Sequence, residues 1–242
     1  MNNYKLTIQY DGTNYAGWQI QNNAVTVQQK ISELVKIILK EDINLIGSGR
    51  TDSGVHALGQ VANFRTENEI DIFRFKHSLN SILPADISVT GLSKVKENFH
   101  ARYDARKRSY LYLLSLKKSP FYINYSWFYH DEIKVIELNR LSGILIGEHD
   151  FTSFSRKNTE IENKDCTVFS AHWKQTGDMV IFLIEANRYL HGMVRTIVGT
   201  LLKLAKEDES EKKLSEILNV KDRETAGEAA PSKGLFLYKV KY

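Results

Sequence analysis

The chain has 242 residues, of which 42% are hydrophobic and 26% are charged, as in typical globular proteins. These values exclude disordered, collagen-like and coiled-coil proteins, and the length predicts one or two domains. The 33 Lys and Arg against 29 Asp and Glu leave a net charge of +4, an excess that matters for binding only where it is clustered.

The first hundred residues predict alternating strands and helices. Residues 4–10 alternate apolar and polar side chains, as a half-buried strand does, and end at the turn signal Asp11-Gly12. Thr26 and Gln29 form a capping-box pattern that predicts an amphipathic helix up to Leu39. A strand at 61–64, a helix at 72–82 that must stop near Pro84 and a strand at 87–92 follow.

A second unit is expected to begin near Ala105. Because its elements mix strands with helices, we predict an α+β fold with domains at residues 1–104 and 105–242. The predicted elements are a strand at 108–114, a helix at 138–145, antiparallel strands at 167–174 and 180–187, a helix at 189–206, a solvated charged loop at 206–213 and a closing strand at 235–242.

Cysteine usage and hydropathy predict where in the cell the protein is found. The single cysteine, Cys166, excludes an internal disulfide and a cysteine-based zinc site. The first twenty residues lack the layout of a signal peptide, and the longest apolar run, residues 179–184, is far shorter than the ~20 residues that span a bilayer. We therefore expect a cytoplasmic protein without a transmembrane segment.

The most unusual stretch is residues 47–56, where three glycines frame Arg50 and Asp52. Glycines permit positive φ angles and close approach by a ligand. The stretch lacks the Gly-Lys-Ser/Thr of a phosphate-binding loop and the glycine spacing of a dinucleotide site, which argues against a nucleotide cofactor. Asp52 alone could also be an ordinary turn residue that bonds its own backbone.

A second candidate is the predicted late helix, where Arg195 lies between Gly192 and Gly199 on the face opposite an apolar stripe. The small residues would leave room for something to approach the arginine. If that side faces a cleft, Arg195 could pair with Asp52 and keep its carboxylate ionised at neutral pH. The alternative is a helical charge that faces solvent.

A third candidate is residues 94–112, which interleave basic and aromatic side chains and include Arg102 and Arg106. Cations can hold phosphates and aromatic faces can stack on bases, so the segment is typical of RNA binding. The alternative is an edge strand whose charges discourage aggregation.

Other constellations give no site. The histidines show no paired spacing of metal ligands, so we predict no metal. Ser153 lies near His149 and Asp150, but no nucleophile elbow accompanies these residues, and helix capping explains them better than a serine hydrolase does.

The stretch Gly49-Arg50-Thr51-Asp52-Ser53-Gly54-Val55-His56-Ala57 closely resembles the signature of the tRNA pseudouridine synthase A (TruA) family. Further resemblances follow in the same order along nearly the whole chain. They lie at residues 10–19 (YDGTNYAGWQ), 79–87, 99–102 (FHAR), 108–112 (RSYLY), 149–154 (HDFTSF), 193–199 (MVRTIVG) and 226–235.

This resemblance implies an enzyme that isomerises uridine to pseudouridine at positions 38, 39 and 40 of the tRNA anticodon stem-loop, without cofactor or metal. It implies two RNA-recognition-like α/β units that share a continuous, mainly antiparallel sheet around a basic cleft. It also implies a homodimer in which tRNA contacts both subunits.

The resemblance further implies roles for single residues. Asp52 would be the catalytic aspartate, and Arg195 would pair with it. Arg50 would assist extrusion of the target base, Tyr110 would stack against that base, and Leu235 would pack near the same pocket. Asp52 could act as a nucleophile at C1′ of the ribose or as a base at C2′, and the residues do not decide between these.

Three positions depart from the usual family pattern. Ser53 replaces a common alanine, and Gly192 and Thr196 replace residues that are often His and Asn, so the preferred substrate position stays open. Two other functions are also left open. One is a noncatalytic tRNA-binding module, and the other is a metal-independent hydrolase that uses Asp52 and His56.

Overall fold

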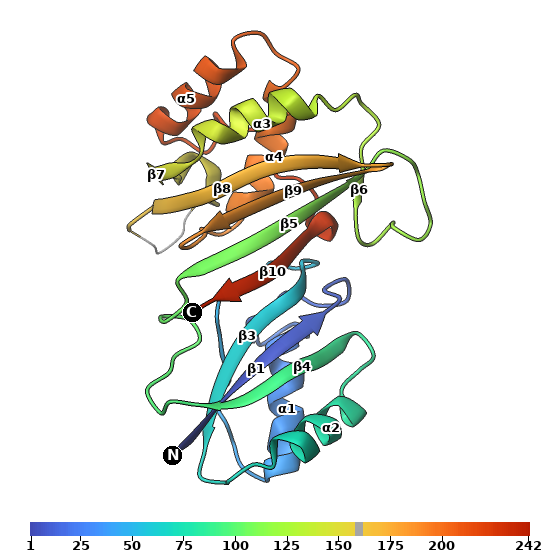
Figure 1. Cartoon of the computed structure of the whole chain (residues 1–242), viewed down its shortest axis with the longest axis vertical. Helices are drawn as coiled ribbons and strands as arrows, with labels where there is room; N and C mark the ends of the chain where they lie inside the picture. Colours follow the sequence, from blue (N-terminus) through green and yellow to red (C-terminus); the bar gives the residue numbers. More distant parts are fainter. Residues whose placement is uncertain (158–161) are drawn as a thin grey trace. The chain divides into compact units, whose positions relative to one another are not determined.

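The computed structural model describes residues 1–157 and 162–242. The chain folds into two compact units (Figure 1). The first comprises residues 1–106 together with 236–242, and the second comprises residues 107–235. Both combine helices with mainly antiparallel strands, which confirms the predicted mixed fold class. The shared sheet and the basic cleft concern the placement of the units and stay predictions.

The sheet of the first unit has the strand order β4-β1-β3-β10, and the short β2 pairs with β3. Its pairs are antiparallel except for β10, which runs parallel to β3. Apart from its first residue, Leu235, the last strand of the chain therefore belongs to the first unit. The bounds are β1 Asn2–Tyr10, β2 Ile46–Gly47, β3 His56–Thr66, β4 Ile87–Val95 and β10 Leu235–Lys241.

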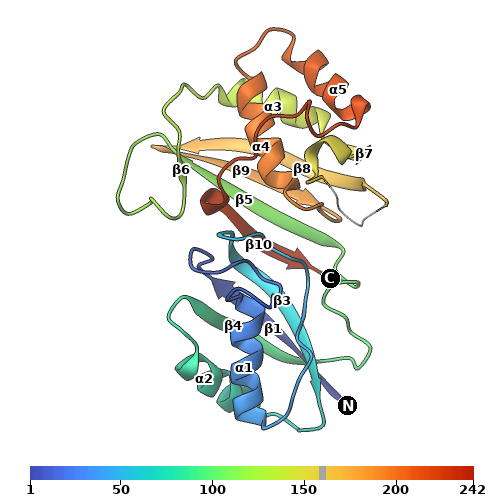
Figure 2. The same cartoon turned by 180° about the vertical axis from the view of Figure 1, so that it is seen from behind.

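Two helices, α1 (Val27–Leu39) and α2 (Ile72–Ile82), lie on one face of this sheet (Figure 2). Alternate residues of β1 are buried, as the sequence pattern predicted. The predicted cap is confirmed, since the Thr26 hydroxyl accepts a hydrogen bond from the Gln29 amide at 3.3 Å. Asp71 caps α2 in the same way, and that helix ends before Pro84.

The sheet of the second unit has the order β5-β9-β8-β7 with antiparallel pairs, and β6 runs parallel to β5. The stacked rings of Trp173 and Phe182 join β8 to β9, and the Trp173 indole donates to Ser142 of α3 at 3.0 Å. The bounds are β5 Lys107–Ser115, β6 Trp127–Phe128, α3 Val135–Ile144, β7 Gly147–Asp150, η1 Thr152–Phe154, β8 Asp165–Thr176, β9 Met179–Ala186, α4 Met193–Leu204, α5 Ser210–Val220 and η2 Ser232–Gly234.

Two sequence predictions are wrong in this unit. The late helix, α4, begins at Met193 rather than near Tyr189, because Gly192 adopts a positive φ of 77° that a right-handed helix does not contain. The charged stretch predicted as a solvated loop runs into α5, which begins at Ser210. Its buried face is formed by Leu214, Ile217 and Leu218, which follow most of the charges in the sequence.

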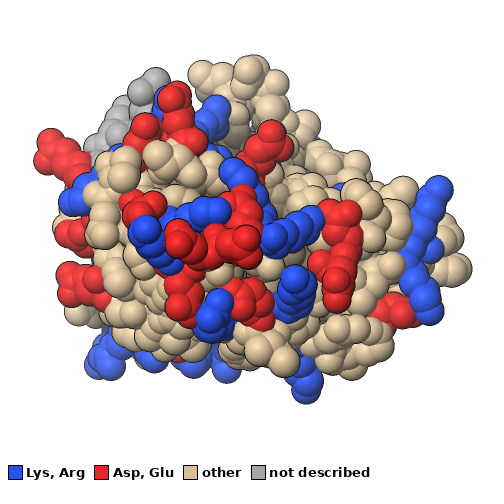
Figure 3. Space-filling view, turned by 90° about the horizontal axis from the view of Figure 1, so that it is seen from above, with Lys and Arg blue, Asp and Glu red and all other residues tan. Residues whose placement is uncertain are grey.

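The charges above these helices are mixed in sign. Figure 3 views this end of the second unit, and acidic and basic side chains alternate across it. For example, the Arg140 guanidinium lies 2.8 Å from the Glu137 carboxylate and 3.1 Å from that of Glu211. Acidic side chains beside the basic ones reduce the attraction of this face for a phosphate backbone.

Candidate active site

Asp52 lies in the connection between β2 and β3, within a tight turn. The Val55 amide donates to the Asp52 carbonyl oxygen at 3.1 Å, and Gly54 takes a positive φ of 72°. A side chain other than glycine rarely adopts such an angle, which explains the glycine at this position. The Asp52 side chain is partly exposed, so it can meet a ligand.

A second loop, residues 11–18, holds the backbone on either side of Asp52. Gly17 has a φ of 94°, and a Cβ there would lie 2.3 Å from the Thr51 carbonyl oxygen and 3.1 Å from the Asp52 carbonyl carbon. A Cβ on Gly12 would lie 2.0 Å from the Val55 carbonyl oxygen. Only glycine permits these approaches. The resemblance singled out both glycines, but their contacts with the aspartate loop come from the tertiary structure.

Hydrogen bonds complete the attachment of the aspartate loop. The Trp18 amide donates to the Thr51 carbonyl at 3.2 Å, and the hydroxyls of Tyr10 and Thr51 lie 2.8 Å apart. Burial raises the pKa of Tyr10 well above its usual range, so its hydroxyl stays protonated. The position of Asp52 is therefore fixed by its neighbours and by a loop about forty residues earlier in the chain.

Arg50 is exposed, whereas the residues before it are anchored. The buried Gln60 accepts from the Ser48 hydroxyl at 2.7 Å and donates to the Gly49 carbonyl at 3.0 Å. The arginine therefore projects from a fixed backbone.

His56 supports the loop instead of facing solvent. Its side chain is 1% exposed, and its ring stacks on Phe236 with centroids 4.6 Å apart. The Gly12 amide donates to His56 Nδ1 at 3.0 Å, and Asp11 Oδ1 lies 3.1 Å from the same nitrogen. A hydrolase would need this histidine to activate an incoming water. Because the His56 side chain is buried, water cannot easily reach it.

In the second unit, Tyr110 projects from β5 and is 8% exposed. Its ring meets that of Tyr189 edge to face, with centroids 5.0 Å apart and planes at 82°. The Tyr189 hydroxyl donates to the Arg108 carbonyl at 3.2 Å, and burial raises the pKa of Tyr189 well above its usual range. Tyr110 is thus a fixed aromatic side chain with a small exposed area.

Arg195 lies in the first turn of α4 and is partly exposed. Its Nε donates to the Ala230 carbonyl oxygen at 2.6 Å, and the Ala230 amide donates to the Arg195 carbonyl at 3.0 Å. The Tyr112 hydroxyl donates to the next carbonyl, that of Pro231, at 2.8 Å. Burial raises the pKa of Tyr112, and the Arg195 charge opposes this rise. The main chain at 230–231 therefore fixes both side chains.

The expected space beside Arg195 is partly filled. A Cβ on Gly199 would lie 1.9 Å from the Glu228 carbonyl oxygen, so the chain's own backbone occupies that side of α4. The Gly227 amide donates to the buried Thr200 hydroxyl at 2.9 Å and fixes this segment further. No atom comes within 4 Å of a Cβ placed on Gly192, where the predicted space is present among the described residues.

The remaining predicted site residues lie in two places. Leu235 is 5% exposed and follows Gly234, whose Cβ would lie 2.8 Å from the Tyr112 ring, so it lies beside this cluster. Arg102 and Arg106 are exposed near the end of the first unit's main segment. In the described parts of the chain, no three His, Cys, Asp or Glu side chains gather as metal ligands would, and no helix is both long and apolar enough to cross a membrane.

Comparison with known proteins identifies the family. A family model described as tRNA pseudouridine synthase matches residues 6–104 and 143–242. The chain belongs to the tRNA pseudouridine synthase family. It is 41% identical to tRNA pseudouridine synthase A of Thermoanaerobacter sp. (strain X514) over the full length of both chains. It is 43% identical to tRNA pseudouridine synthase A 1 of Protochlamydia amoebophila, over all of this chain and 97% of the relative.

The match to the tRNA pseudouridine synthase family includes Asp52 and Arg195 but not residues 105–142, where Tyr110 lies. The two relatives align across that segment as well. Among solved structures, a chain of a Cbf5–Nop10–Gar1 complex aligns with a TM-score of 0.38 at 11% identity, covering 82% of this chain and 53% of that chain. The score is so low that we infer no shared fold from it.

Sequence reasoning missed the residues that hold Arg195 in place. Gly227 and Ala230 act through their backbone groups, and Thr200 acts through a buried hydroxyl that bonds to the backbone. The only signal available was the pair of glycines, Gly199 and Gly227, in two segments that resemble the family.

Proposed function

We propose that the protein isomerises uridine to pseudouridine at positions 38, 39 and 40 of the tRNA anticodon stem-loop. As a member of the tRNA pseudouridine synthase family it is an isomerase that acts on tRNA. The observation that carries the proposal is the anchored Asp52 loop. Gly12 and Gly17 press against its backbone, while the Asp52 side chain stays partly exposed.

The reaction balances without a cofactor. The N1–C1′ bond of uridine breaks, the uracil turns, and a C5–C1′ bond forms. C5 then loses its proton to solvent, while N1 gains one. Because no electron or group enters or leaves, we propose that neither a cofactor nor a metal is needed. The base must leave the stack for this rotation, which requires a pocket with an aromatic wall.

Each site residue has a proposed role in that sequence. Asp52 acts on the ribose, as a nucleophile at C1′ or as a base at C2′. Arg195 pairs with the Asp52 carboxylate and keeps it ionised, and its fixed Nε supports a defined direction for the guanidinium. A neutral acid at this position could not serve in either role.

The other residues handle the base and the RNA backbone. Arg50 projects from a fixed backbone and assists extrusion of the uridine. Tyr110, held by Tyr189, provides the surface against which the base stacks, and Leu235 packs near the same pocket. Arg102 and Arg106 contact phosphates.

The test is release of tritium from tRNA labelled at C5 of uridine. Asp52→Asn should bind tRNA with nearly unchanged affinity and lose at least about 1000-fold in release rate. Asp42→Asn is the matched control, because Asp42 is highly exposed and pairs only with Lys36 among the ion pairs of the described residues. Full release by Asp52→Asn would overturn the assignment.

The same assay distinguishes the noncatalytic alternative. A tRNA-binding module would bind tRNA tightly as the unaltered protein and leave all tritium in place. Mapping pseudouridine in tRNA, with and without the protein, then shows which of positions 38, 39 and 40 are modified. Unmodified uridine at all three would contradict the proposed positions.

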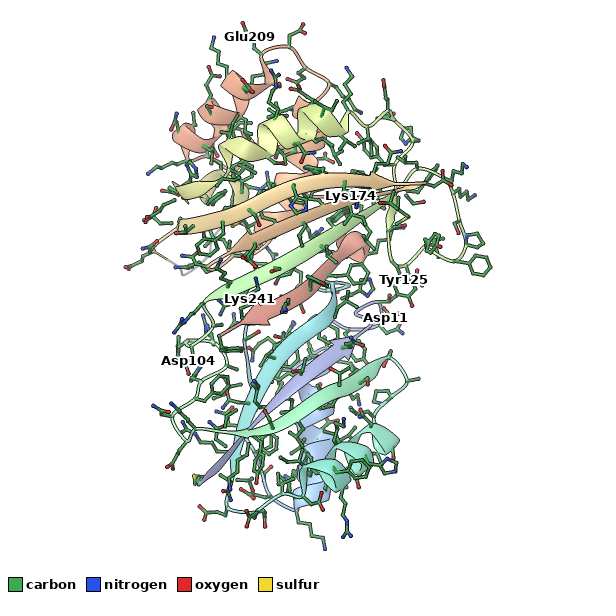
Figure 4. All side chains as sticks on the ribbon, viewed as in Figure 1. Asp11, Asp104, Tyr125, Lys174, Glu209 and Lys241 are labelled. Carbon is green, nitrogen blue, oxygen red and sulfur yellow. The ribbon has the colours of Figure 1, made fainter. Side chains whose placement is uncertain are left out.

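We also propose a homodimer in the cytoplasm, where an enzyme of tRNA would meet its substrate. The dimer is supported by an exposed apolar stretch, residues 119–126, in the connection between β5 and β6. It contains Tyr125 (Figure 4) and has no Lys, Arg, Asp or Glu. Phe121 is 83% exposed and Ile123 is 57% exposed. Burying such side chains favours association. Sedimentation velocity should show a dimer that Phe121→Asp weakens, whereas a monomer at all concentrations would contradict it.

A further inference from the structure

Residues 100–104 form a compact turn in the basic and aromatic segment. His100 Nδ1 accepts hydrogen bonds from the amides of Arg102 and Tyr103, both at 3.2 Å. The His100 amide donates to Asp104 Oδ2 at 2.9 Å, and the Asp104 amide donates to the His100 carbonyl at 3.1 Å. The side chains of Arg102 and Tyr103 therefore project into solvent from a closed backbone, and Tyr103 is 75% exposed.

Two buried asparagines fasten the segment that leads into this turn. Asn3 is 1% exposed and donates through Nδ2 to the carbonyls of Lys96, Glu97 and Phe99 at 3.1, 3.2 and 2.9 Å. Asn63, also 1% exposed, donates to Asn3 Oδ1 at 3.0 Å. Its own Oδ1 accepts from the Ala101 amide at 2.8 Å. Asn3 in β1 thus holds the residues before the turn, and Asn63 in β3 holds the turn itself at Ala101.

Tyr242, which follows β10, also contacts Ala101, through the carbonyl group of that residue. Its hydroxyl donates to the Ala101 carbonyl oxygen at 2.8 Å, so the amide and the carbonyl of Ala101 are both bonded to side chains distant in the sequence. The Tyr242 ring packs against Phe99 with centroids 4.9 Å apart. The Arg106 amide donates to the Lys241 carbonyl at 2.9 Å (Figure 4 labels Asp104 and Lys241).

The charges around the turn suit an RNA backbone. Arg102, Arg106 and Lys241 are exposed, and the Arg102 guanidinium lies 5.7 Å from the Tyr103 ring centroid. Lys5 Nζ lies 6.0 Å from the Phe99 centroid and 5.9 Å from that of Tyr242. The acidic Asp104 uses one carboxylate oxygen to close the turn, so its charge is partly engaged. Cations beside an exposed aromatic ring can hold phosphate and stack a base.

We propose that Tyr242 is a positioning residue for tRNA binding, which presets the turn so that Arg102 and Tyr103 meet the RNA without further ordering. The inference rests on the proposed function, since it assumes that this surface contacts tRNA. A flexible turn would lose backbone and side-chain entropy on binding, and this cost would weaken affinity. The hydroxyl of Tyr242 removes that cost before the RNA arrives.

The test compares Tyr242→Phe with Tyr238→Phe by fluorescence anisotropy on labelled, unmodified tRNA at one salt concentration. Tyr238 lies on the same strand and is 45% exposed. Within residues 1–157 and 162–242, its hydroxyl makes no hydrogen bond to another side chain or backbone group, which makes it a matched control. Tyr242→Phe should raise Kd by about 3- to 10-fold, the effect of one hydrogen bond, and Tyr238→Phe should leave Kd unchanged. Equal Kd for Tyr242→Phe and the unaltered protein would overturn the proposal.

A double-mutant cycle separates positioning from general stability. If Tyr242 acts through the turn, Tyr242→Phe should cost less than about 2-fold in Kd when Arg102→Ala is already present. A merely structural role would give the same loss in both backgrounds. The single-turnover rate at saturating tRNA should stay unchanged, because the reacting base is not touched.

Hydrogen exchange gives a measurement that needs no RNA. The amides of residues 101–103 should exchange faster in Tyr242→Phe than in Tyr238→Phe, and unchanged exchange would contradict the hold on the turn. If the unaltered protein fails to bind tRNA, the proposed function fails. If it binds tRNA and Tyr242→Phe matches it, only the positioning role fails.

Discussion

Arg195 and Ala230 are joined by two hydrogen bonds in opposite directions. The guanidinium Nε donates to the Ala230 carbonyl at 2.6 Å, and the Ala230 amide donates to the Arg195 carbonyl at 3.0 Å. One peptide segment thus fixes both the backbone and the side chain of the arginine. A charged side chain with several rotatable bonds gains a defined direction from this arrangement, and a site with preset charge needs little reorganisation during reaction.

Thr200 tests this arrangement without touching the arginine. Its buried hydroxyl accepts from the Gly227 amide at 2.9 Å and donates to the Thr196 carbonyl at 2.7 Å. Thr200→Val keeps the shape but leaves the Gly227 amide unsatisfied, so the free energy of unfolding should fall by about 1–3 kcal/mol. Tritium release should also fall, because the segment that holds Arg195 shifts.

Thr200→Ser is the matched control, since it keeps the hydroxyl and should recover most of the stability and rate. Denaturant unfolding and single-turnover release measure the two effects. If Thr200→Val leaves the unfolding free energy and the release rate unchanged, residues 227–230 do not position Arg195.

Gly17 tests the attachment of the Asp52 loop. Alanine there would place a Cβ 2.3 Å from the Thr51 carbonyl oxygen at a φ of 94°. We expect a loss of about 2–5 kcal/mol in unfolding free energy, which combines backbone strain with overpacking. Denaturant unfolding measures this loss.

Gly177→Ala provides the comparison, because Gly177 also has a positive φ, 56°, but no atom of the described residues lies within 4 Å of its Cβ position. Its unfolding free energy should fall only by the cost of backbone strain, about 1–2 kcal/mol. Equal losses for the two variants would mean that the close approach at Gly17 is unimportant.

The phosphate contacts proposed for Arg102 and Arg106 predict a change in salt dependence. The affinity of tRNA falls with salt because binding releases counterions, and each lost phosphate contact should reduce the slope of log K against log salt by about 0.7–0.9. Arg102→Ala and Arg106→Ala should each show this reduction. Arg74→Ala, on the exposed side of α2, should not. An unchanged slope for both variants would place the phosphate contacts elsewhere.

Cys166 predicts a loss of stability at high pH. The side chain is 1% exposed, and burial raises the pKa of its thiol from 9.0 to about 11. The folded state therefore favours the neutral thiol, and its stabilising effect, complete below pH 9, is lost as the pH rises from 9 to 11. The unfolding free energy should fall by up to about 3 kcal/mol more in the unaltered protein than in Cys166→Ser. Parallel pH curves for the two proteins would contradict this.

Much of the fold could be predicted because it follows from local patterns. The alternation in residues 4–10 predicted β1, and Thr26 with the following apolar spacing predicted α1 and its cap. The start of α4 could not be predicted, because a helical apolar pattern does not reveal that Gly192 has a positive φ. The α5 helix was missed because its buried leucines follow a run of charges.

The candidate site divides in the same way. Glycine density and charge identified the Asp52 loop, and interleaved cations and rings identified the segment around Arg102. The supports of these residues could not be found, because each depends on a backbone group far away in the sequence: Thr51 for Gly17, Ala230 for Arg195 and Ala101 for Tyr242. A backbone group has the same chemistry at every residue, so no residue type announces such contacts.

The parallel pairing of β10 with β3 has a consequence for synthesis on the ribosome. Residues 107–235 are made between the two pieces of the first unit. At about 5–20 residues per second, the earlier piece must wait roughly 6–25 seconds for its last strand. Until then β3 lacks this neighbour, and the Ala101 carbonyl lacks the hydroxyl of Tyr242. The turn at residues 100–104 therefore lacks this hydrogen bond until Tyr242 has been made.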